Sequence, residues 1–143
     1  CILNSVLNIK YSAAQVADIK IESNIFVPKY MNIDYGDMGV LFGNLLDNAI
    51  EANQGVDRKK RWINVSVKYE EHILIINIKN SKIRGSRRKK KGYLNHGIGL
   101  NSVKQIVEKF NGIVEVQDFG EMYEVSAILY GICDDKDLGK SVL

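Results

Sequence analysis

The chain has 143 residues, 45% of them hydrophobic and 26% charged, with a formal net charge of +3. This size and composition fit a single globular domain with its own core. The sequence contains no run of about 18 apolar residues and no signal peptide, which excludes a membrane span within it. Cys1 and Cys133 lie near opposite ends without a Cys-x-x-Cys pattern, which disfavours a zinc site or a disulfide framework and favours a reducing cytosol.

Hydrophobic periodicity divides the first half of the chain into alternating helices and strands. The predicted elements, in chain order, are a helix at Ile2–Ala17, a strand at Ile19–Phe26, a connection at Val27–Tyr35 and a helix at Asp37–Gln54. The connection contains Pro28, the only proline. A polar loop at Gly55–Arg61 follows and leads into a β-rich region.

The second half of the chain predicts two hairpins separated by a basic loop and a third helix. Its elements, in chain order, are strands at Trp62–Tyr69 and His72–Asn80, a loop at Ser81–His96, a helix that opens at Asn95–Leu100 and ends near Phe110, and strands at Ile113–Asp118 and Met122–Tyr130. Asn111 and Gly112 supply a C-terminal stop for this helix.

Tight turns join most of these strands, so the sheet should be mixed and mostly antiparallel. Three helices would cover one of its faces, which predicts an α/β two-layer sandwich. We expect one domain over residues 1–143, with a core at about 3–130 and a tail at 131–143.

The helix at Asp37–Gln54 has an unusual polar face. At 100° per residue, its polar residues fall on one stripe opposite the apolar side. The stripe consists of Asn44, Asp47, Asn48 and Glu51. Asn and Asp are poor helix formers because their short side chains compete for backbone hydrogen bonds, so the stripe indicates a functional constraint. A neutral amide oxygen suits Mg²⁺ that already carries phosphates and water; a chance polar stripe is the alternative.

A second motif is the segment Asn95–Leu100, which reads NHGIGL. Glycines at the start of a helix let backbone N–H groups approach an anion, and the helix dipole favours negative charge there. Taken alone, a Gly-x-Gly is a weak signal, and an ordinary loop-to-helix turn is its more common explanation. Its weight comes from its pairing with the Asn-rich helix.

Basic charge is concentrated in the loop before this motif. No Asp or Glu occurs from His72 through Val107, whereas Arg and Lys fill most of residues 84–91. Long loops of this kind are often functional or mobile. For any single residue in the run, a solvated charge without function is the alternative.

The two motifs, GNLLDNAIEAN and HGIGLNSVKQIVEKFNG, resemble the N-box and the second glycine box of the GHKL ATPases, which include gyrase, Hsp90, histidine kinases and MutL. They are most similar to the ATP-binding domains of sensor histidine kinases, and among these to the peptide-pheromone quorum-sensing receptors of Gram-positive bacteria. The segment VLNIKYSAAQVADIKIES resembles the same subfamily. The resemblance covers about Leu3 to Tyr130 and implies the Bergerat fold of this superfamily.

The resemblance implies a site for ATP and Mg²⁺ between the Asn-rich helix and the basic loop. It places the magnesium ligand on the side-chain oxygen of Asn48. Asn44 stands one turn earlier, where related hydrolases carry a Glu that activates water. A neutral Asn is a poor general base, which favours phosphoryl transfer over hydrolysis. Asp47 and Glu51 are further candidates near the nucleotide, with a structural salt bridge as an equal alternative for Glu51.

The second glycine box and the basic loop, as an ATP lid, are expected to hold the phosphates. The candidate nucleotide-binding residues of the box are His96, Gly97, Ile98, Gly99 and Leu100. Lys91 and its basic neighbours would neutralise phosphate oxygens when the lid closes. Charge stabilisation and in-line geometry are the main requirements of phosphoryl transfer.

The sequence departs from the family pattern at the first glycine box. That box usually reads Asp-x-Gly-x-Gly, and its Asp accepts a hydrogen bond from the adenine amino group. Here the corresponding segment, Ile78–Lys82, reads IKNSK. Asn80 is expected to accept this bond through its amide oxygen, more weakly by about 1 kcal/mol because it is neutral.

A histidine kinase also needs a phosphoacceptor, and neither His72 nor His96 has the expected setting of an exposed helix with acidic neighbours. The resemblance therefore implies an acceptor on an upstream dimerisation helix, from which the phosphoryl group passes to a response regulator. The chain begins with Cys rather than Met, which predicts a fragment. We expect this fragment to be monomeric and inactive in phosphotransfer by itself, and to be the cytoplasmic domain of a membrane-anchored homodimer.

Other functions remain open from the sequence. They are a non-kinase GHKL ATPase, an anti-sigma-type Ser kinase, a degenerate domain that binds partners and little ATP, and a nucleic-acid binder that uses residues 84–91. Hydrolases generally keep Glu at position 44. A basic loop can bind phosphate backbones, but it leaves the Asn stripe unexplained and has few aromatics for base stacking. We therefore expect no nucleic-acid partner.

Overall fold

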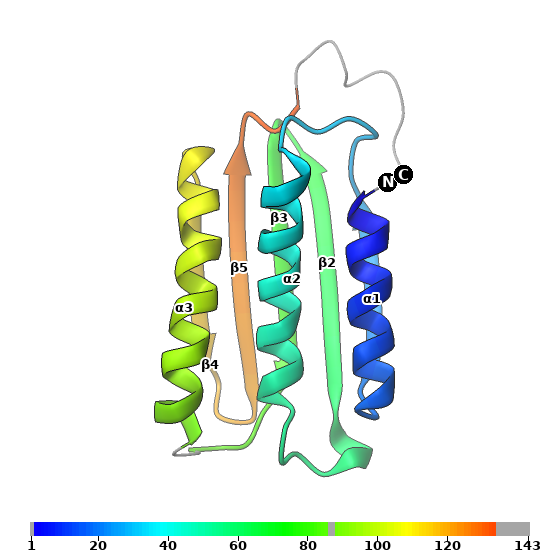
Figure 1. The fold of residues 1–143 in the computed structure, drawn as a ribbon, viewed down its shortest axis with the longest axis vertical. Helices are drawn as coiled ribbons and strands as arrows, with labels where there is room; N and C mark the ends of the chain where they lie inside the picture. Colours follow the sequence, from blue (N-terminus) through cyan, green and yellow to red (C-terminus); the bar gives the residue numbers. More distant parts are fainter. Residues whose placement is uncertain (1, 86–87, 134–143) are drawn as a thin grey trace.

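The computed structural model describes residues 2–85 and 88–133, and for Ile2 and residues 88–98 it describes the backbone alone. The chain folds into helices packed on a five-stranded sheet (Figure 1). The elements, in chain order, are α1 (Ile2–Val16), β1 (Lys20–Phe26), α2 (Tyr35–Ala52), the 3₁₀ turn η1 (Arg58–Lys60), β2 (Trp62–Glu70), β3 (Ile73–Ser81), α3 (Arg88–Lys109), β4 (Ile113–Asp118) and β5 (Met122–Tyr130).

The sheet has the strand order β1-β2-β3-β5-β4. β1 and β2 are parallel and are joined through α2, because a parallel pair needs a long crossover. The other neighbours are antiparallel, which confirms the predicted mixed sheet and both hairpins. β3 is the middle strand of the sheet, and it pairs with β5 although the basic segment, α3 and β4 lie between them in the sequence.

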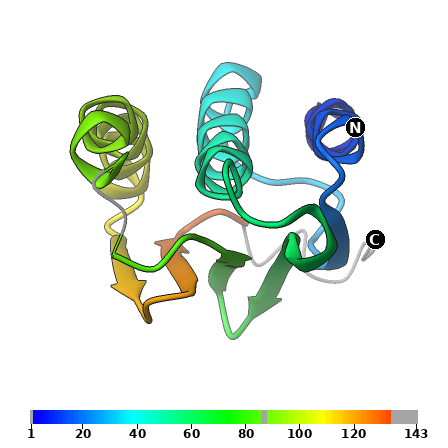
Figure 2. The same cartoon turned by 90° about the horizontal axis from the view of Figure 1, so that it is seen from below.

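The helices α1, α2 and α3 lie side by side on one face of the sheet, and no helix of the described residues lies on the opposite face (Figure 2). Alternate residues of β3 face the helices, and these include Leu74, Ile76 and Ile78, each 1% exposed. This arrangement confirms the predicted two-layer sandwich. None of the helices in the described ranges is long and apolar enough to cross a membrane.

The central helix, α2, contributes the largest share of the core. Its buried apolar residues are Met38, Leu41, Phe42, Leu45, Leu46 and Ala49. Asp34 caps its N-terminus, where Oδ1 accepts the backbone N–H of Asp37 at 2.7 Å. The helix begins at Tyr35 and ends at Ala52, two residues earlier at each end than its periodicity predicts.

The third helix begins earlier than expected. The predicted loop at Ser81–His96 is wrong over its second half, because α3 starts at Arg88. Arg and Lys are good helix formers and no proline interrupts the run, so the basic residues extend the helix towards the N-terminus. The NHGIGL motif therefore lies within α3 and not at its start. The predicted stop is confirmed: Asn111 has φ +56° and the N–H of Gly112 bonds Val107 O at 3.0 Å.

Two further segments depart from the sequence interpretation. The predicted loop at Gly55–Arg61 contains the turn η1, and the Arg61 guanidinium donates to Val56 O at 2.8 Å and to Ala17 O at 2.7 Å. These bonds fasten the segment to the end of α1. Ile132 falls in the expected tail but is fully buried, so the core extends beyond residue 130. The rest of that tail, residues 134–143, lies outside the described residues.

Candidate functional site

The polar residues of α2 divide between the two neighbouring helices. Asp47 Oδ1 forms an ion pair at 2.7 Å with Lys10 Nζ of α1. Asn44 lies against α3, because a Cβ added at Gly99 would stand 3.9 Å from Asn44 Cβ and Cγ. The predicted single stripe is therefore split. Asp47 lies 60° around the helix from Asn44 on the side of α1, so its carboxylate is engaged away from the other candidates.

Asn48 follows Asn44 by one turn and lies on the side of α2 away from Asp47. Its side chain is only 5% exposed. Its Oδ1 atom is buried and has no hydrogen-bond partner among the described residues. An unsatisfied buried acceptor costs about 1–3 kcal/mol, and native proteins rarely leave one without a reason. The oxygen that the sequence assigns to Mg²⁺ is thus available to a ligand.

Asn80 presents a second acceptor of this kind. It is the penultimate residue of β3, is fully buried, and shares the helix-facing side of the strand with Ile78. Its Nδ2 donates to Ser81 O at 3.0 Å, whereas its Oδ1 is buried without a partner in the described structure. This is the oxygen that the sequence assigns to the adenine amino group.

The two unsatisfied oxygens lie at the same end of the domain. Asn53, five residues after Asn48 and just beyond the end of α2, accepts a hydrogen bond from the hydroxyl of Ser81, the neighbour of Asn80. The C-terminal end of α2 therefore contacts the C-terminal end of β3. This contact places Asn80 beside the end of the helix that carries Asn48.

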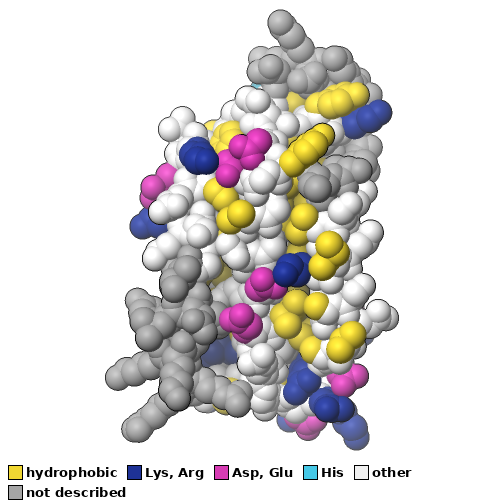
Figure 3. All heavy atoms as spheres, viewed as in Figure 1, with side chains coloured by type: hydrophobic (Ala, Val, Ile, Leu, Met, Phe, Trp, Pro, Cys, Tyr) yellow, Lys and Arg dark blue, Asp and Glu magenta, His cyan; other side chains and the backbone are white. Residues whose placement is uncertain are grey.

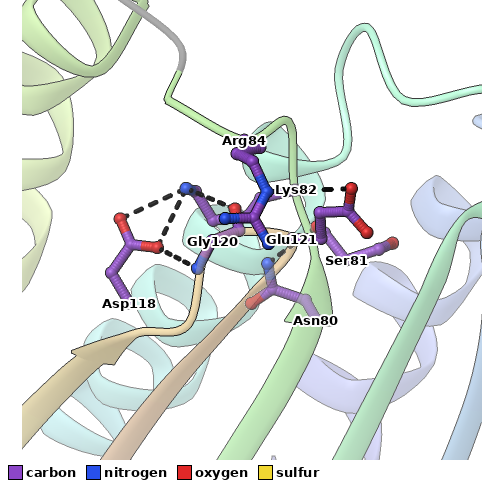
Figure 4. A network of polar contacts seen from close by, with 7 residues as sticks. All are labelled: Asn80, Ser81, Lys82, Arg84, Asp118, Gly120 and Glu121. Carbon is purple, nitrogen blue, oxygen red and sulfur yellow. Dashed lines mark hydrogen bonds and ion pairs between the residues drawn. The ribbon is translucent and has the colours of Figure 1, made fainter.

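A basic side chain anchors the segment that leaves β3. Lys82 Nζ binds Asp118 Oδ1 at 3.0 Å, Asp118 Oδ2 at 3.2 Å and Gly120 O at 2.9 Å (Figure 4). The Lys82 side chain is 9% exposed and that of Asp118 is 25% exposed, so solvent reaches this ion pair mainly from the side of the carboxylate. Arg84 lies next, over the turn at Gly120. These bonds therefore fix the position of Lys82, two residues after Asn80 and just before the basic segment begins.

Tyr123 is the cross-strand neighbour of both Asn80 and Asp118. Burial of the phenol and, to a smaller extent, the negative charge of Asp118 raise the pKa of Tyr123 above its ordinary value of 10.0. The phenol therefore stays protonated and neutral at physiological pH.

For the remaining residues that the sequence assigns to the nucleotide site, the structure describes the backbone and only some of the side chains. Glu51 is exposed on α2, and Gly99 and Leu100 are half-buried on α3. For Lys91, His96, Gly97 and Ile98 the structure gives a helical backbone within α3, and their side chains lie outside the described residues. The part of the chain that the structure describes contains no cluster of three or more His, Cys, Asp or Glu residues able to hold a metal. A metal here would depend on Asn48 and on phosphate oxygens, a combination that suits Mg²⁺.

Sequence reasoning missed Asn53, Ser81, Lys82 and Asp118. Asn53 and Ser81 are 28 residues apart and Lys82 and Asp118 are 36 apart, so no local spacing signals either pair. The one available signal is the position of Ser81 and Lys82 directly after Asn80.

Charged side chains of both signs are mixed over α1 and α2 on the helical face (Figure 3). Hydrophobic side chains run between them along the junction of the two helices. This part of the surface therefore lacks the one-sided positive charge that a phosphate-backbone interface requires.

A sequence profile described as the GHKL domain matches residues 33–129. The chain belongs to the GHKL domain family. The match begins just before α2 and ends within β5, so it includes Asn48, Asn80 and the whole of α3.

A probable C4-dicarboxylate sensor kinase of Bacillus subtilis (strain 168) is 32% identical over an alignment of 95 positions, and the match covers 59% of this chain. The chain covers 18% of the length of that relative. Among solved structures, a nucleotide-free catalytic domain of histidine kinase ThkA has a TM-score of 0.66 at 14% identity, with 90% of both chains covered. Full-length ShkA in complex with AMPPNP has a TM-score of 0.69 at 14% identity, covering 92% of this chain and 30% of that one. The fold is that of histidine kinase catalytic domains.

Proposed function

We propose that this chain is the ATP-binding catalytic domain of a sensor histidine kinase, which transfers the γ-phosphoryl group of ATP to a histidine on a separate dimerisation helix. Membership of the GHKL family supports an ATP site between α2 and α3. The observation that carries the proposal is the buried Oδ1 of Asn48, which has no donor among the described residues. An acceptor of this kind fits a hard cation.

In this proposal each asparagine has one role. Asn48 binds Mg²⁺ through Oδ1, and Asn80 accepts a hydrogen bond from the adenine amino group. Mg²⁺ held by Asn48 would supply positive charge that neutralises the phosphates. Asn44 is neutral and lies against Gly99, so the site offers no carboxylate at this position to activate water. The chain is thereby suited to phosphoryl transfer to a positioned nucleophile.

The glycine box has to change conformation before it can contact phosphates. Gly97 and Gly99 lie within α3, where their N–H groups belong to the interior of a helix. Contact between these groups and a triphosphate requires the first turns of α3 to open. Each glycine weakens a helix by about 1 kcal/mol relative to alanine, which lowers the cost of opening. Lys91 would then neutralise phosphate oxygens as part of the lid.

The identity of the complete protein is part of the same proposal. The segment VLNIKYSAAQVADIKIES and the wording of the N-box support a peptide-pheromone receptor kinase. Its partners would be the dimerisation domain with the acceptor histidine and a response regulator. The chain would be the cytoplasmic part of a membrane-anchored homodimer.

Calorimetric titration with a non-hydrolysable ATP analogue, with and without Mg²⁺, tests the site. Asn48→Ala should weaken binding in Mg²⁺ about tenfold or more and leave Mg²⁺-free binding nearly unchanged, because it removes a metal ligand. The variant should also unfold no earlier than the wild type, since it deletes an unsatisfied buried oxygen worth about 1 kcal/mol. Asn4→Ala, an exposed helical asparagine on α1, is the matched control.

Equal loss of binding with and without Mg²⁺ would contradict the metal role of Asn48. No binding by the wild type at millimolar nucleotide would favour a degenerate interaction domain.

A further inference from the structure

A buried hydrogen-bond network includes Ser81, the residue that follows Asn80. The Ser81 hydroxyl donates to Asn53 Oδ1 and accepts the backbone N–H of Trp62 at 2.9 Å. Asn53 Nδ2 donates to Ala49 O at 3.0 Å and reaches Trp62 O at 3.4 Å. Asn53 is 1% exposed and Ser81 is 5% exposed. The network therefore joins the end of α2, the start of β2 and the end of β3 in the interior.

The backbone carbonyl of Ser81, a residue of this network, determines which atom of the Asn80 side chain is free. The Asn80 carboxamide has a donor end and an acceptor end that differ little in shape. Its Nδ2 donates to Ser81 O at 3.0 Å (Figure 4). In the reversed orientation, Oδ1 would stand at that distance from the Ser81 carbonyl oxygen. Two acceptors would then be in contact, which is unfavourable. The Ser81 carbonyl thus keeps Asn80 Oδ1 directed away from it, as the free acceptor.

We propose that Asn53 and Ser81 are positioning residues that give the site its preference for 6-aminopurines over 6-oxopurines. This inference rests on the proposed function and deepens it. Asn53 fixes the Ser81 hydroxyl, and Ser81 in turn fixes the carbonyl that orients Asn80. An acceptor at Asn80 Oδ1 pairs with a 6-amino group and opposes a 6-oxo group. A released carboxamide could rotate and donate to the oxo group instead.

The test compares the binding of two nucleotides, ATP and ITP. ITP replaces the 6-amino group of ATP with an oxygen and protonates N1, and otherwise it is unchanged. Both are titrated into the complete chain with Mg²⁺ present, and the measured quantity is the ratio of the two affinities. We expect wild-type protein to favour ATP about tenfold or more, because a site built around one hydrogen-bonding group rejects an analogue that lacks it.

Ser81→Ala should reduce this ratio about threefold or more by strengthening ITP binding relative to ATP. Ser81→Thr keeps the hydroxyl and should retain the ratio. Ser126→Ala is the matched control, since it deletes a hydroxyl on β5 that accepts from Asn77 at 2.9 Å on the uncovered face of the sheet. Thermal unfolding of each variant by circular dichroism checks that the fold is retained.

Asn80→Asp separates positioning from general destabilisation. A carboxylate accepts at both oxygens and cannot present a donor by rotation. In the Asn80→Asp background, the preference for ATP should persist and Ser81→Ala should leave it unchanged.

Equal weakening of both nucleotides by Ser81→Ala, with an unchanged ratio, would overturn the inference and leave the proposed function intact. A wild type that binds neither nucleotide would overturn both.

Discussion

Gly112 lies between the end of α3 and the start of β4, in close contact with the backbone of β5. A Cβ at this position would stand 1.8 Å from Ile128 O and 2.8 Å from Val107 Cγ1. Gly112→Ala should therefore lower the free energy of unfolding by about 2 kcal/mol or more, because a backbone atom cannot move aside as a side chain can. Urea unfolding monitored by circular dichroism measures this loss.

Gly39→Ala is the control for that substitution. A Cβ at Gly39 meets no atom within 4 Å, and the residue lies inside α2. The same change should here raise the free energy of unfolding by about 0.5–1 kcal/mol, since alanine is the better helix former. Equal effects at both positions would contradict the close contact at Gly112.

Single residues were predictable where their type conflicts with their surroundings. Asn48 stands out because asparagine is a poor residue for the middle of a helix, and Asn80 because it replaces an expected Asp. Neither argument extends to Asn53 or Ser81. Their roles arise from the meeting of a helix end with a strand end 28 residues away, which no sequence periodicity encodes.

At the scale of elements, the β4–β5 hairpin carries a titratable group. Burial and the Asp118 carboxylate raise the pKa of Tyr123 above 10.0, so the folded chain holds this proton more tightly than the unfolded chain. The resulting stability is complete below about pH 10 and is lost as pH rises through the folded pKa. The melting temperature should therefore fall as the pH rises above 10, and it should fall less in Tyr123→Phe.

All other groups are the same in the two proteins, so the difference between their pH profiles isolates the phenol. Identical pH profiles would show that Tyr123 does not contribute.

The elements differ in how far the sequence determines them. The hairpins follow from alternation with period two, and both were predicted with nearly their observed bounds. α3 was predicted too short because its first turns, from Arg88, contain basic residues without an apolar stripe. Periodicity gives no signal there, whereas the helix propensity of Arg and Lys acts on every residue of the run.

For the molecule as a whole, the two-layer arrangement predicts unequal effects at adjacent positions of one strand. Ile76 faces the helices and is 1% exposed, whereas Ile75 faces the uncovered side of the sheet and is half-buried. Ile76→Ala should lower the free energy of unfolding by about 3 kcal/mol, within the range for buried isoleucines. Ile75→Ala should cost about 1 kcal/mol. Urea unfolding compares the pair, and equal losses would mean that both faces are covered.

The fold class followed from the sequence because tight turns between most consecutive strands and three helices leave few alternatives. The strand order did not follow. The placement of β5 between β3 and β4 depends on contacts between residues that are far apart in the sequence. Periodicity specifies which face of a strand is buried but not its neighbour in the sheet.

The central ladder joins parts of the chain on either side of α3, with a register that runs from Ile73↔Tyr130 to Ser81↔Met122. If the backbone were severed between β3 and α3, one piece would keep α1, α2 and three strands, and the other would keep α3 and the last hairpin. The first piece would lack β5, the partner of β3, and the second would lack β3, the partner of β5. Mixing the two pieces should restore this ladder, which makes the domain a scaffold for fragment complementation.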